Sequence, residues 1–247
     1  MVEIVELIKD IKLNDLRGTK IRAVDGVSFS VPENSIFSIV GVNGAGKSTL
    51  LKVVLNFLAP TVGSTTIRSG VRFGYLPENP YYYDYLTLKE LLWFAAKASG
   101  LTGRQIAERT VKVAAAVGMQ NSLKHKLRSF SKGMVQRAGI AAAIVHDPEL
   151  LILDEPMSGL DPLGRNLVFD LIQEMKAAGK TVLFCSHILN DVERLCDHVV
   201  IMKAGRVEHF LSKDENSIFS HQDRFSLLGK PDDLEKTFYQ VNAQGGV

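Results

Sequence analysis

The stretch GVNGAGKST, residues 41–49, decides the fold expected of this chain. It fits the pattern G-x-x-x-x-G-K-[ST] with Gly41, Gly46, Lys47 and Ser48, and it follows the apolar run SIFSIV. Glycines let backbone N–H groups wrap around phosphates, the lysine reaches the β and γ phosphates, and the serine hydroxyl can ligate Mg²⁺. We therefore expect a buried strand, a phosphate-binding loop and a helix in that order, rather than a plain glycine-rich turn.

Composition narrows the class of protein. The chain has 247 residues, 46% of them hydrophobic, which suits one globular domain or one domain with a subdomain. Its net charge of +2 predicts no nucleic-acid partner. The apolar runs, such as LLIL at 150–153, are far shorter than the roughly 20 residues that span a bilayer. Cys185 and Cys196 have no ligand-spaced histidine nearby, so we expect reduced core thiols and a cytoplasmic protein.

Strand and helix patterns alternate along most of the chain, which is typical of an α/β fold with a largely parallel sheet. Between residues 87 and 146 only helical periodicity appears, so we expect an inserted helical subdomain there. Strands are expected at 2–12, 24–31, 36–40, 65–68, 71–76, 150–153 and 181–187, with a hairpin over 198–210 turning at Ala204-Gly205. Helices are expected at 47–58, from 87, at 102–117, from 131, near 163–178, near 188–195 and at 232–241.

Charged side chains follow two of the expected strands. LLILDEP places Asp154 and Glu155 at the end of a run that is buried on both faces, where a parallel sheet presents its chemistry. Asp154 is placed to hold Mg²⁺ through water, and Glu155 to polarise an attacking water. His187 ends the strand TVLFCSH. It could contact a γ-phosphate or serve a structural role, and the residues alone leave both open.

A second helix start lies far from the phosphate loop. In FSKGMVQR, residues 130–137, Ser131 is placed as an N-cap and Gly133 leaves the first turn without a side chain. Exposed backbone N–H groups and the positive end of the helix dipole make such a start an anion site. A plain capped helix is the alternative.

Five motifs stand in one order: GVNGAGKST, GYLPE, FSKGMVQR, LLILDEPMSGLD and SH. Together, over about residues 3–210, they resemble the ATP-binding subunit of ABC transporters, most of all exporters of the ABC-2 type. The resemblance implies a P-loop NTPase fold. Its RecA-like, mostly parallel sheet core has an N-terminal antiparallel β portion and carries an inserted all-helical subdomain. It implies an ATP-binding core at 1–79 and 147–210, a helical signature subdomain at 80–146 and a C-terminal extension at 211–247.

The resemblance also implies roles for single residues. Family members pair head to tail with ATP sandwiched between them, so Ser131 and Gly133 would cap the γ-phosphate bound to the partner copy. Glu155 would be the general base and His187 the γ-phosphate switch. Asp161 would lie at the dimer seam, although it is equally well placed as an N-cap before Pro162. ATP contacts are implied for Gly41, Asn43, Gly44, Ala45, Gly46, Lys47, Ser48, Thr49, Glu78, Ser131, Gly133 and Asp161, and Mg²⁺ contacts for Ser48, Asp154 and Glu78.

The partners follow from the same resemblance. It implies an ATPase that works as a homodimer or pseudo-dimer on the cytoplasmic face of a membrane and powers export through a separate integral membrane subunit. That subunit would meet an aromatic socket among Tyr81, Tyr82 and Tyr83, whereas we expect Trp93 to pack inside the helical subdomain. The family's usual aromatic residue for stacking on adenine is missing from the stretch LRGTKIRAV, where Arg17 could stack instead. A ribosome- or DNA-directed ATPase and a non-hydrolysing scaffold are the competing classes. The ribosome- or DNA-directed class would be favoured by a second cassette or by coiled-coil arms, and neither appears in this sequence. The intact motif residues oppose a non-hydrolysing scaffold.

Overall fold

The computed structural model describes residues 1–12, 18–213 and 234–243. These residues form two compact units: Met1–Gly70 with Cys185–Val247, and Val71–Phe184. Strand β7 (Thr181–Ser186) carries the chain from the second unit back into the first. The division into ATP-binding core, helical subdomain and C-terminal extension at residues 79, 146 and 210 follows the sequence motifs, and it stays a prediction.

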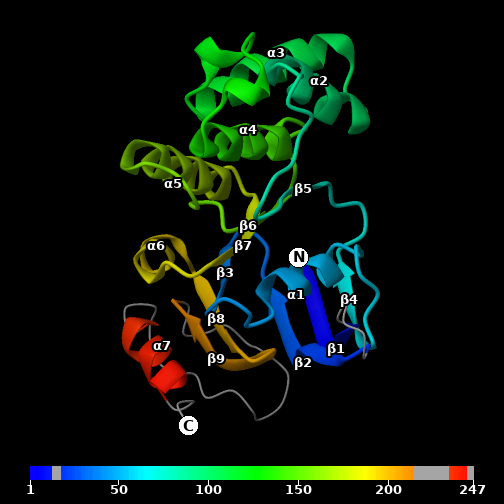
Figure 1. Ribbon diagram of the computed structural model, residues 1–247, viewed down its shortest axis with the longest axis vertical. Coiled ribbons are helices and arrows are strands. Elements are labelled where there is room, and N and C mark those ends of the chain that lie inside the picture. Colours follow the sequence, from blue (N-terminus) through cyan, green and yellow to red (C-terminus); the bar gives the residue numbers. More distant parts are fainter. Residues whose placement is uncertain (13–17, 214–233, 244–247) are drawn as a thin grey trace. The chain divides into compact units, whose positions relative to one another are not determined.

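The first unit opens with an antiparallel sheet in the order β2-β1-β4 (Figure 1). β1 (Val2–Lys12) pairs with β2 (Lys20–Val31) on one side and with β4 (Val62–Ile67) on the other. The predicted antiparallel portion is therefore confirmed, with β2 beginning four residues earlier than expected. The early residues of β2 are mostly exposed, and Ile21 is exposed although it is apolar, so no buried alternation marked them.

The same unit contains the strand that leads into the phosphate loop. All five residues of β3 (Ile36–Val40) are buried, and β3 pairs in parallel with β8 (His198–Lys203). β8 turns back antiparallel into β9 (Arg206–Ser212) through Ala204 and Gly205, whose φ angles are 47° and 82°. Positive φ at both central residues is the geometry of a tight hairpin turn, and it confirms the predicted turn.

Three helices belong to this unit: α1 (Lys47–Val54), α6 (Leu189–Leu195) and α7 (Leu234–Ala243). α6 contacts β3, and α7 contacts both α6 and β8. α1 ends four residues before the predicted end, because Asn56 takes a left-handed conformation with φ 58° and the N–H groups of Phe57 and Leu58 turn back to the carbonyl of Lys52.

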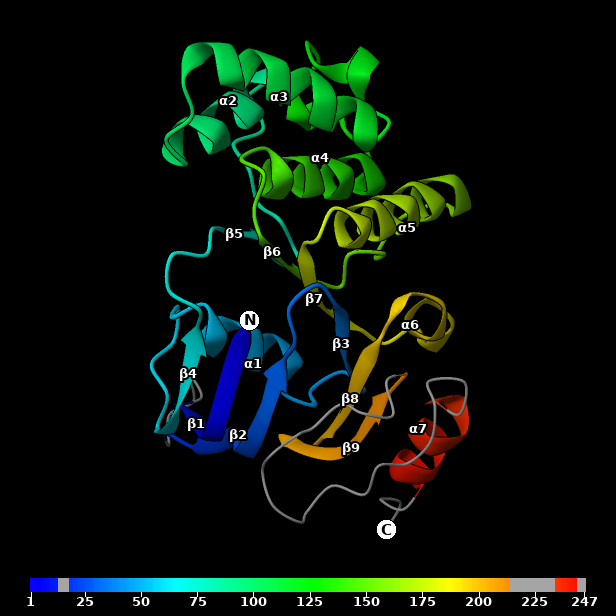
Figure 2. The same cartoon turned by 180° about the vertical axis from the view of Figure 1, so that it is seen from behind.

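The second unit joins the parallel strands β5 (Phe73–Leu76) and β6 (Leu150–Asp154) and the first residues of β7 to a group of helices (Figure 2). β5 pairs with β6, and α4 (Lys132–Ile144) contacts β5, α2 (Leu88–Ala98), α3 (Gly103–Ala116) and α5 (Pro162–Ala177). Residues 88–145 contain only helices, two 3₁₀ turns (Gln120–Ser122 and Leu127–Ser129) and connecting turns, besides the bridge of Lys126 to Thr87. The predicted all-helical insert is confirmed.

The expected α/β class, with parallel strands β3, β5, β6 and β8 and an N-terminal antiparallel portion, is confirmed. Cys185 and Cys196 are both buried and form no disulfide, as predicted. None of the helices among the described residues is both long enough and apolar enough to cross a membrane.

Candidate nucleotide site

The phosphate loop connects β3 to α1 in the first unit. Gly46 is the N-cap of α1 with φ 102°, and a Cβ there would collide with the carbonyl oxygen of Ala23. Only glycine fits this combination of left-handed backbone and close approach. Ala45, inside the loop, donates its N–H to Val42 at 3.1 Å. The result is a tight loop that leads directly into the first turn of a helix, which is the arrangement that binds phosphate.

Lys47 is the first residue of α1 and is almost fully buried. Its Nζ lies over the loop and donates to the carbonyl oxygens of Gly41 at 2.7 Å and Val42 at 3.3 Å. Ser48 and Thr49, next along the helix, are half-buried, whereas Asn43 and Gly44 at the tip of the loop are exposed. The Lys47 ammonium therefore lies against the backbone of the loop, while Asn43 and Gly44 are its exposed residues.

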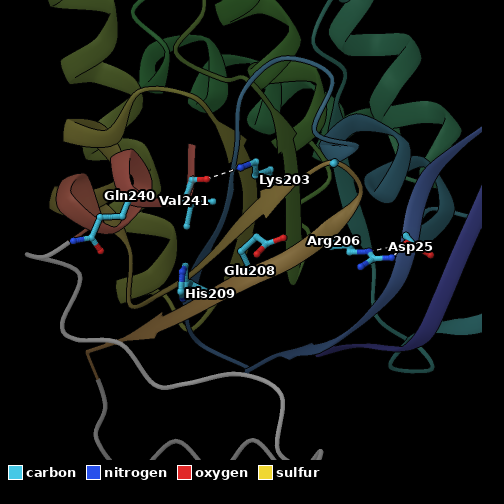
Figure 3. Close-up of a pocket in the computed structure, with 8 residues that line it drawn as sticks. Asp25, Lys203, Arg206, Glu208, His209, Gln240 and Val241 are labelled. Carbon is cyan, nitrogen blue, oxygen red and sulfur yellow. Dashed lines mark hydrogen bonds and ion pairs between the residues drawn. The ribbon is translucent and has the colours of Figure 1, made fainter. Parts of the chain in front are cut away.

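The β8–β9 hairpin braces this loop. The Gly205 N–H donates to the carbonyl of Ala45 at 3.0 Å, and the Gly205 carbonyl accepts from the Asp25 N–H at 2.9 Å. Beside the turn, Arg206 forms an ion pair with Asp25 at 2.6 Å, and hydrogen bonds from Arg206 lower the pKa of that carboxyl (Figure 3). This support could not be predicted from the sequence, because local spacing predicts a hairpin turn but not what the turn contacts.

The turn also forms one wall of a cavity of about 760 Å³. Figure 3 shows Lys203 of β8 reaching α7, where its Nζ donates to the carbonyl of Val241 at 2.6 Å. The cavity is lined by side chains of both charge signs, which are the acidic Asp25 and Glu208 and the basic Lys203 and Arg206. None of the residues predicted for nucleotide contact lines this cavity.

The second unit contains the carboxylates. Asp154 ends β6 with 1% of its surface exposed, and Glu155, also buried, follows with φ 53°. Leu76 of β5 lies opposite Leu153 of β6 in a parallel pair. Glu78 therefore leaves its strand at the same register as Glu155, at the carboxyl edge where parallel sheets carry their chemistry. The structure brings Glu78 to the same sheet edge as the two acids and leaves it exposed.

The second helix start belongs to the same unit as the carboxylates. Ser131 is the N-cap of α4, and its Oγ accepts from the N–H of Met134 at 3.3 Å. A Cβ on Gly133 would lie 3.0 Å from the carbonyl oxygen of Gly159, and the stem of Lys132 covers Gly159. The first turn of α4 therefore packs against the loop that leads to Asp161, which caps α5 by accepting from the Gly164 N–H at 2.7 Å. The predicted N-caps at Ser131 and Asp161 are both confirmed.

His187 belongs to the same unit as the phosphate loop. His187 follows β7 in the first unit and is exposed, and the neighbouring Ile188 N–H donates to Ser186 Oγ at 3.0 Å. The phosphate loop and His187 thus lie in one unit, while Glu78, Asp154, Glu155, Ser131, Gly133 and Asp161 lie in the other. Arg17, expected to stack on adenine, lies outside the described residues.

The donor chemistry fits Mg²⁺. A carboxylate at Asp154 and a hydroxyl at Ser48 are hard oxygen ligands, and Mg²⁺ beside a nucleotide keeps waters and phosphate oxygens and takes only one or two ligands from the protein. No three His, Cys, Asp or Glu side chains gather into a metal cluster in the part of the chain that the structure describes.

An aromatic groove opens on the second unit. Its volume is about 560 Å³, and it is lined by Tyr81, Tyr82, Tyr83, Tyr85, Leu86, Leu91 and Phe94. Tyr82 is the more enclosed of the tyrosines, and burial raises its pKa to about 12, whereas Tyr81 is 90% exposed. Trp93 was expected inside the helical subdomain, and this expectation is wrong. Its ring meets Phe94 edge-on at 5.2 Å and is 45% exposed, because position 93 of α2 points away from the face formed by Leu88, Leu91 and Leu92.

Gln136 is a buried polar residue that was not predicted from the sequence. Gln136 of α4 is 3% exposed and donates from Nε2 to the carbonyl oxygens of Glu155 at 3.0 Å and Pro156 at 3.3 Å. A polar residue ahead of the run AGIAAAI was the available signal. It was hidden because glutamine is ordinary on a helix and its burial cannot be read from spacing.

Comparison with known proteins places this geometry in a family. Residues 24–158 match the ABC transporter family. An uncharacterised ABC transporter ATP-binding protein, all4389 of Nostoc, is 40% identical over 87% of this chain and 67% of its own length. In two further ABC transporter ATP-binding proteins, at 39% and 42% identity, the match spans only 61% and 64% of the relative, so the chain covers less than two thirds of their length.

Solved structures agree on the fold. The ATP-binding subunit of an ABC transporter, 32% identical, superposes with a TM-score of 0.77 over 87% of this chain and 91% of its own. The dimeric post-hydrolysis state of the ATP-binding cassette MJ0796, bound to ADP and Pi, superposes with a TM-score of 0.78 over 87% of this chain and 99% of its own at 22% identity. At that identity the second likeness speaks for the fold alone.

Proposed function

Since this chain belongs to the ABC transporter family, as one of its ATP-binding ATPase cassettes, we propose that two copies bind two MgATP molecules head to tail and power export through a separate membrane subunit. In each copy the loop of Gly41, Asn43, Gly44, Ala45 and Gly46 wraps the phosphates of one ATP. Lys47 reaches the β and γ phosphates, and the hydroxyls of Ser48 and Thr49 complete the cradle.

The catalytic chemistry falls to the carboxylates and the histidine. Glu155 accepts a hydrogen bond from the attacking water and orients it toward the γ-phosphate, while His187 contacts the γ-phosphate as the switch. Ser48, Asp154 and Glu78 are the residues that would hold Mg²⁺, and the bound ion would supply positive charge to the phosphates. The near-complete burial of Asp154 supports this role, because a buried carboxylate is costly unless a cation or hydrogen bonds compensate its charge.

The observation that carries the head-to-tail arrangement is the start of α4. Ser131 is exposed and is the N-cap of the helix, Gly133 leaves the first turn without a side chain, and Lys132 adds a cation. The loop ending at Asp161 packs directly beside this turn. A positive helix end of this kind suits the γ-phosphate of an ATP held by another copy. In this arrangement Asp161 lies at the dimer seam.

The test replaces the proposed base. Glu155→Gln should bind MgATP with near wild-type affinity and hydrolyse it at least about a hundredfold more slowly. It should also accumulate as a dimer in light scattering when MgATP is added. Glu174→Gln, an exposed carboxylate on α5 in the same unit, is the matched control and should turn over like the wild type. Lys47→Ala should weaken nucleotide binding itself. Wild-type turnover by Glu155→Gln would remove the proposed base.

The membrane subunit docks, in this proposal, through a short helix with an apolar face that enters the aromatic groove. The exposed rings of Tyr81, Tyr83, Tyr85 and Phe94 support this occupant, because tyrosine and other aromatic residues supply most of the binding energy at interfaces. The groove belongs to the helical insert, which fits the family resemblance.

Co-purification tests the partner. Wild-type protein should bring down an integral membrane protein, and Phe94→Glu or Tyr83→Glu should lose it while keeping basal ATP hydrolysis. Val111→Glu, an exposed apolar residue on α3 outside the groove, is the matched control and should keep the partner. Recovery of ribosomes or DNA in place of a membrane protein would favour the competing class of soluble ATPase.

A further inference from the structure

A buried amide connects the signature helix to the backbone that carries the proposed base. Gln136 sits in α4 with 3% of its surface exposed. Its Nε2 group donates two hydrogen bonds, to the carbonyl oxygens of Glu155 at 3.0 Å and Pro156 at 3.3 Å. Both acceptors and the donor belong to the same compact unit. A buried amide is costly unless its hydrogen bonds are made, so this contact fixes α4 against the end of β6.

The backbone that Gln136 holds is unusual. Glu155 has φ 53°, a left-handed conformation that a non-glycine residue adopts only when its surroundings impose it. Its carbonyl oxygen also accepts from the Ser158 N–H at 3.1 Å, so both lone pairs of that oxygen are used. Because the side chain leaves from the same Cα, the direction in which the carboxylate points depends on this turn being held. Gln136 holds this turn from outside through its two hydrogen bonds.

The rest of α4 is anchored independently of this contact. Arg137, the next residue, donates from Nη1 to the carbonyl oxygens of Val117 and Gly118 at the end of α3. Arg109 of α3 donates to the last carbonyls of α4, at Ile144 and Val145. Loss of Gln136 would therefore release the Glu155 turn without releasing the helix.

We propose that Gln136 is a positioning residue for ATP hydrolysis. It holds the left-handed turn at Glu155 so that the carboxylate can orient the attacking water, and it ties that turn to the helix whose first residues face the partner's ATP. The inference rests on the proposed function, because it takes Glu155 as the base. It assigns Gln136 no contact with nucleotide.

The experiment uses Gln136→Met, which keeps the length of the side chain and removes both donors. We expect kcat to fall about tenfold to a hundredfold, as small misplacements of a catalytic group do, with the Kd for MgATP unchanged within about twofold. Arg137→Met is the matched control. It removes hydrogen bonds to backbone carbonyls from the adjacent residue, so it should lower the unfolding temperature and keep kcat. Gln136→Asn, whose amide is one methylene too short, should lower kcat in the same way and serves if the methionine variant does not fold.

A double-mutant cycle separates positioning from general damage. In single-turnover hydrolysis, Gln136→Met should slow the wild type but leave Glu155→Gln unchanged within about twofold, because the positioned carboxylate is already gone. An equal slowing in both backgrounds, or a kcat of folded Gln136→Met within twofold of the wild type, would overturn the proposal. Failure of the proposed function looks different, since Glu155→Gln alone would then hydrolyse ATP at the wild-type rate.

Discussion

The sequence supports two roles for Asp161 equally well, as the N-cap of α5 and as a residue of the dimer seam. Its Oδ1 accepts from the Gly164 N–H at 2.7 Å, and Pro162, the first residue of α5, has no N–H to satisfy. The cap therefore serves Gly164 directly, while the Asp161 carbonyl accepts the Arg165 N–H at 2.9 Å in the first intrahelical bond. A residue that only caps should be replaceable by any capping side chain, whereas a seam residue should not.

The structure sets the size of the expected loss. Replacing an aspartate N-cap by alanine costs about 1 kcal/mol, and the lost charge at the helix N-terminus adds a few tenths more. For a protein of this size the unfolding temperature of Asp161→Ala should fall by about 2–4 °C. Asp161→Asn keeps a capping oxygen and should recover most of that loss. Circular dichroism at 222 nm during heating measures both variants.

Turnover then decides the second role. If Asp161 lies at the seam between two copies, Asp161→Asn should be nearly as stable as the wild type yet hydrolyse ATP more slowly. It should also form less of the MgATP-dependent dimer in the Glu155→Gln background. A stable Asp161→Asn variant with wild-type turnover and dimer content would refute the seam role. An unchanged unfolding temperature for Asp161→Ala would refute the cap energetics.

Three shorter predictions concern the loop, the groove and the helical insert. Gly46→Ala should abolish nucleotide binding and lower the free energy of unfolding by about 1–3 kcal/mol in urea titrations, because φ 102° and the Ala23 carbonyl leave no room for a Cβ. Burial raises the pKa of Tyr82 to about 12, so the unfolded chain loses that proton first. The free energy of unfolding should thus fall by up to about 3 kcal/mol as the pH rises from about 10 to 12, and Tyr82→Phe should flatten this decline in urea titrations at stepped pH. Arg109→Met should cost about 1–3 kcal/mol by the same titration, because it leaves the carbonyls of Ile144 and Val145 at the end of α4 without their donor.

Local signals accounted for most of the fold. Buried strands before Gly41 and Asp154 were marked by unbroken apolar runs, and the helix starts at Ser131 and Asp161 were marked by capping residues. These features depend on a few neighbouring residues, so the sequence carries them directly. The ends were harder to predict. α1 stops early because Asn56 turns left-handed, and nothing in NFLAP distinguishes that turn from one more turn of helix.

Features that depend on distant contacts were not predicted. Trp93 is a different case, because helical spacing already places it off the face of Leu91 and Leu92, and the expectation followed its apolar character instead. The bracing of Ala45 by Gly205 joins residues 160 positions apart, and the Gln136 contact joins a helix to the strand end that follows it. Such pairings are set by packing, which spacing within a segment does not report.

Gln136 and Ser131 lie on one short span of α4 in the second unit. Ser131 and Gln136 are five residues apart on α4, a separation of about 7.5 Å along the helix axis. One end of this short span would face the γ-phosphate of the partner's ATP, and the other holds the backbone of Glu155. The first turn of the same helix also packs on the loop that ends at Asp161. A displacement at Ser131 would therefore reach the proposed base and the proposed seam through α4 itself, without a longer route through the core. Head-to-tail pairing would then do more than complete each ATP site, because ATP bound by one copy would set the geometry of the base in the other.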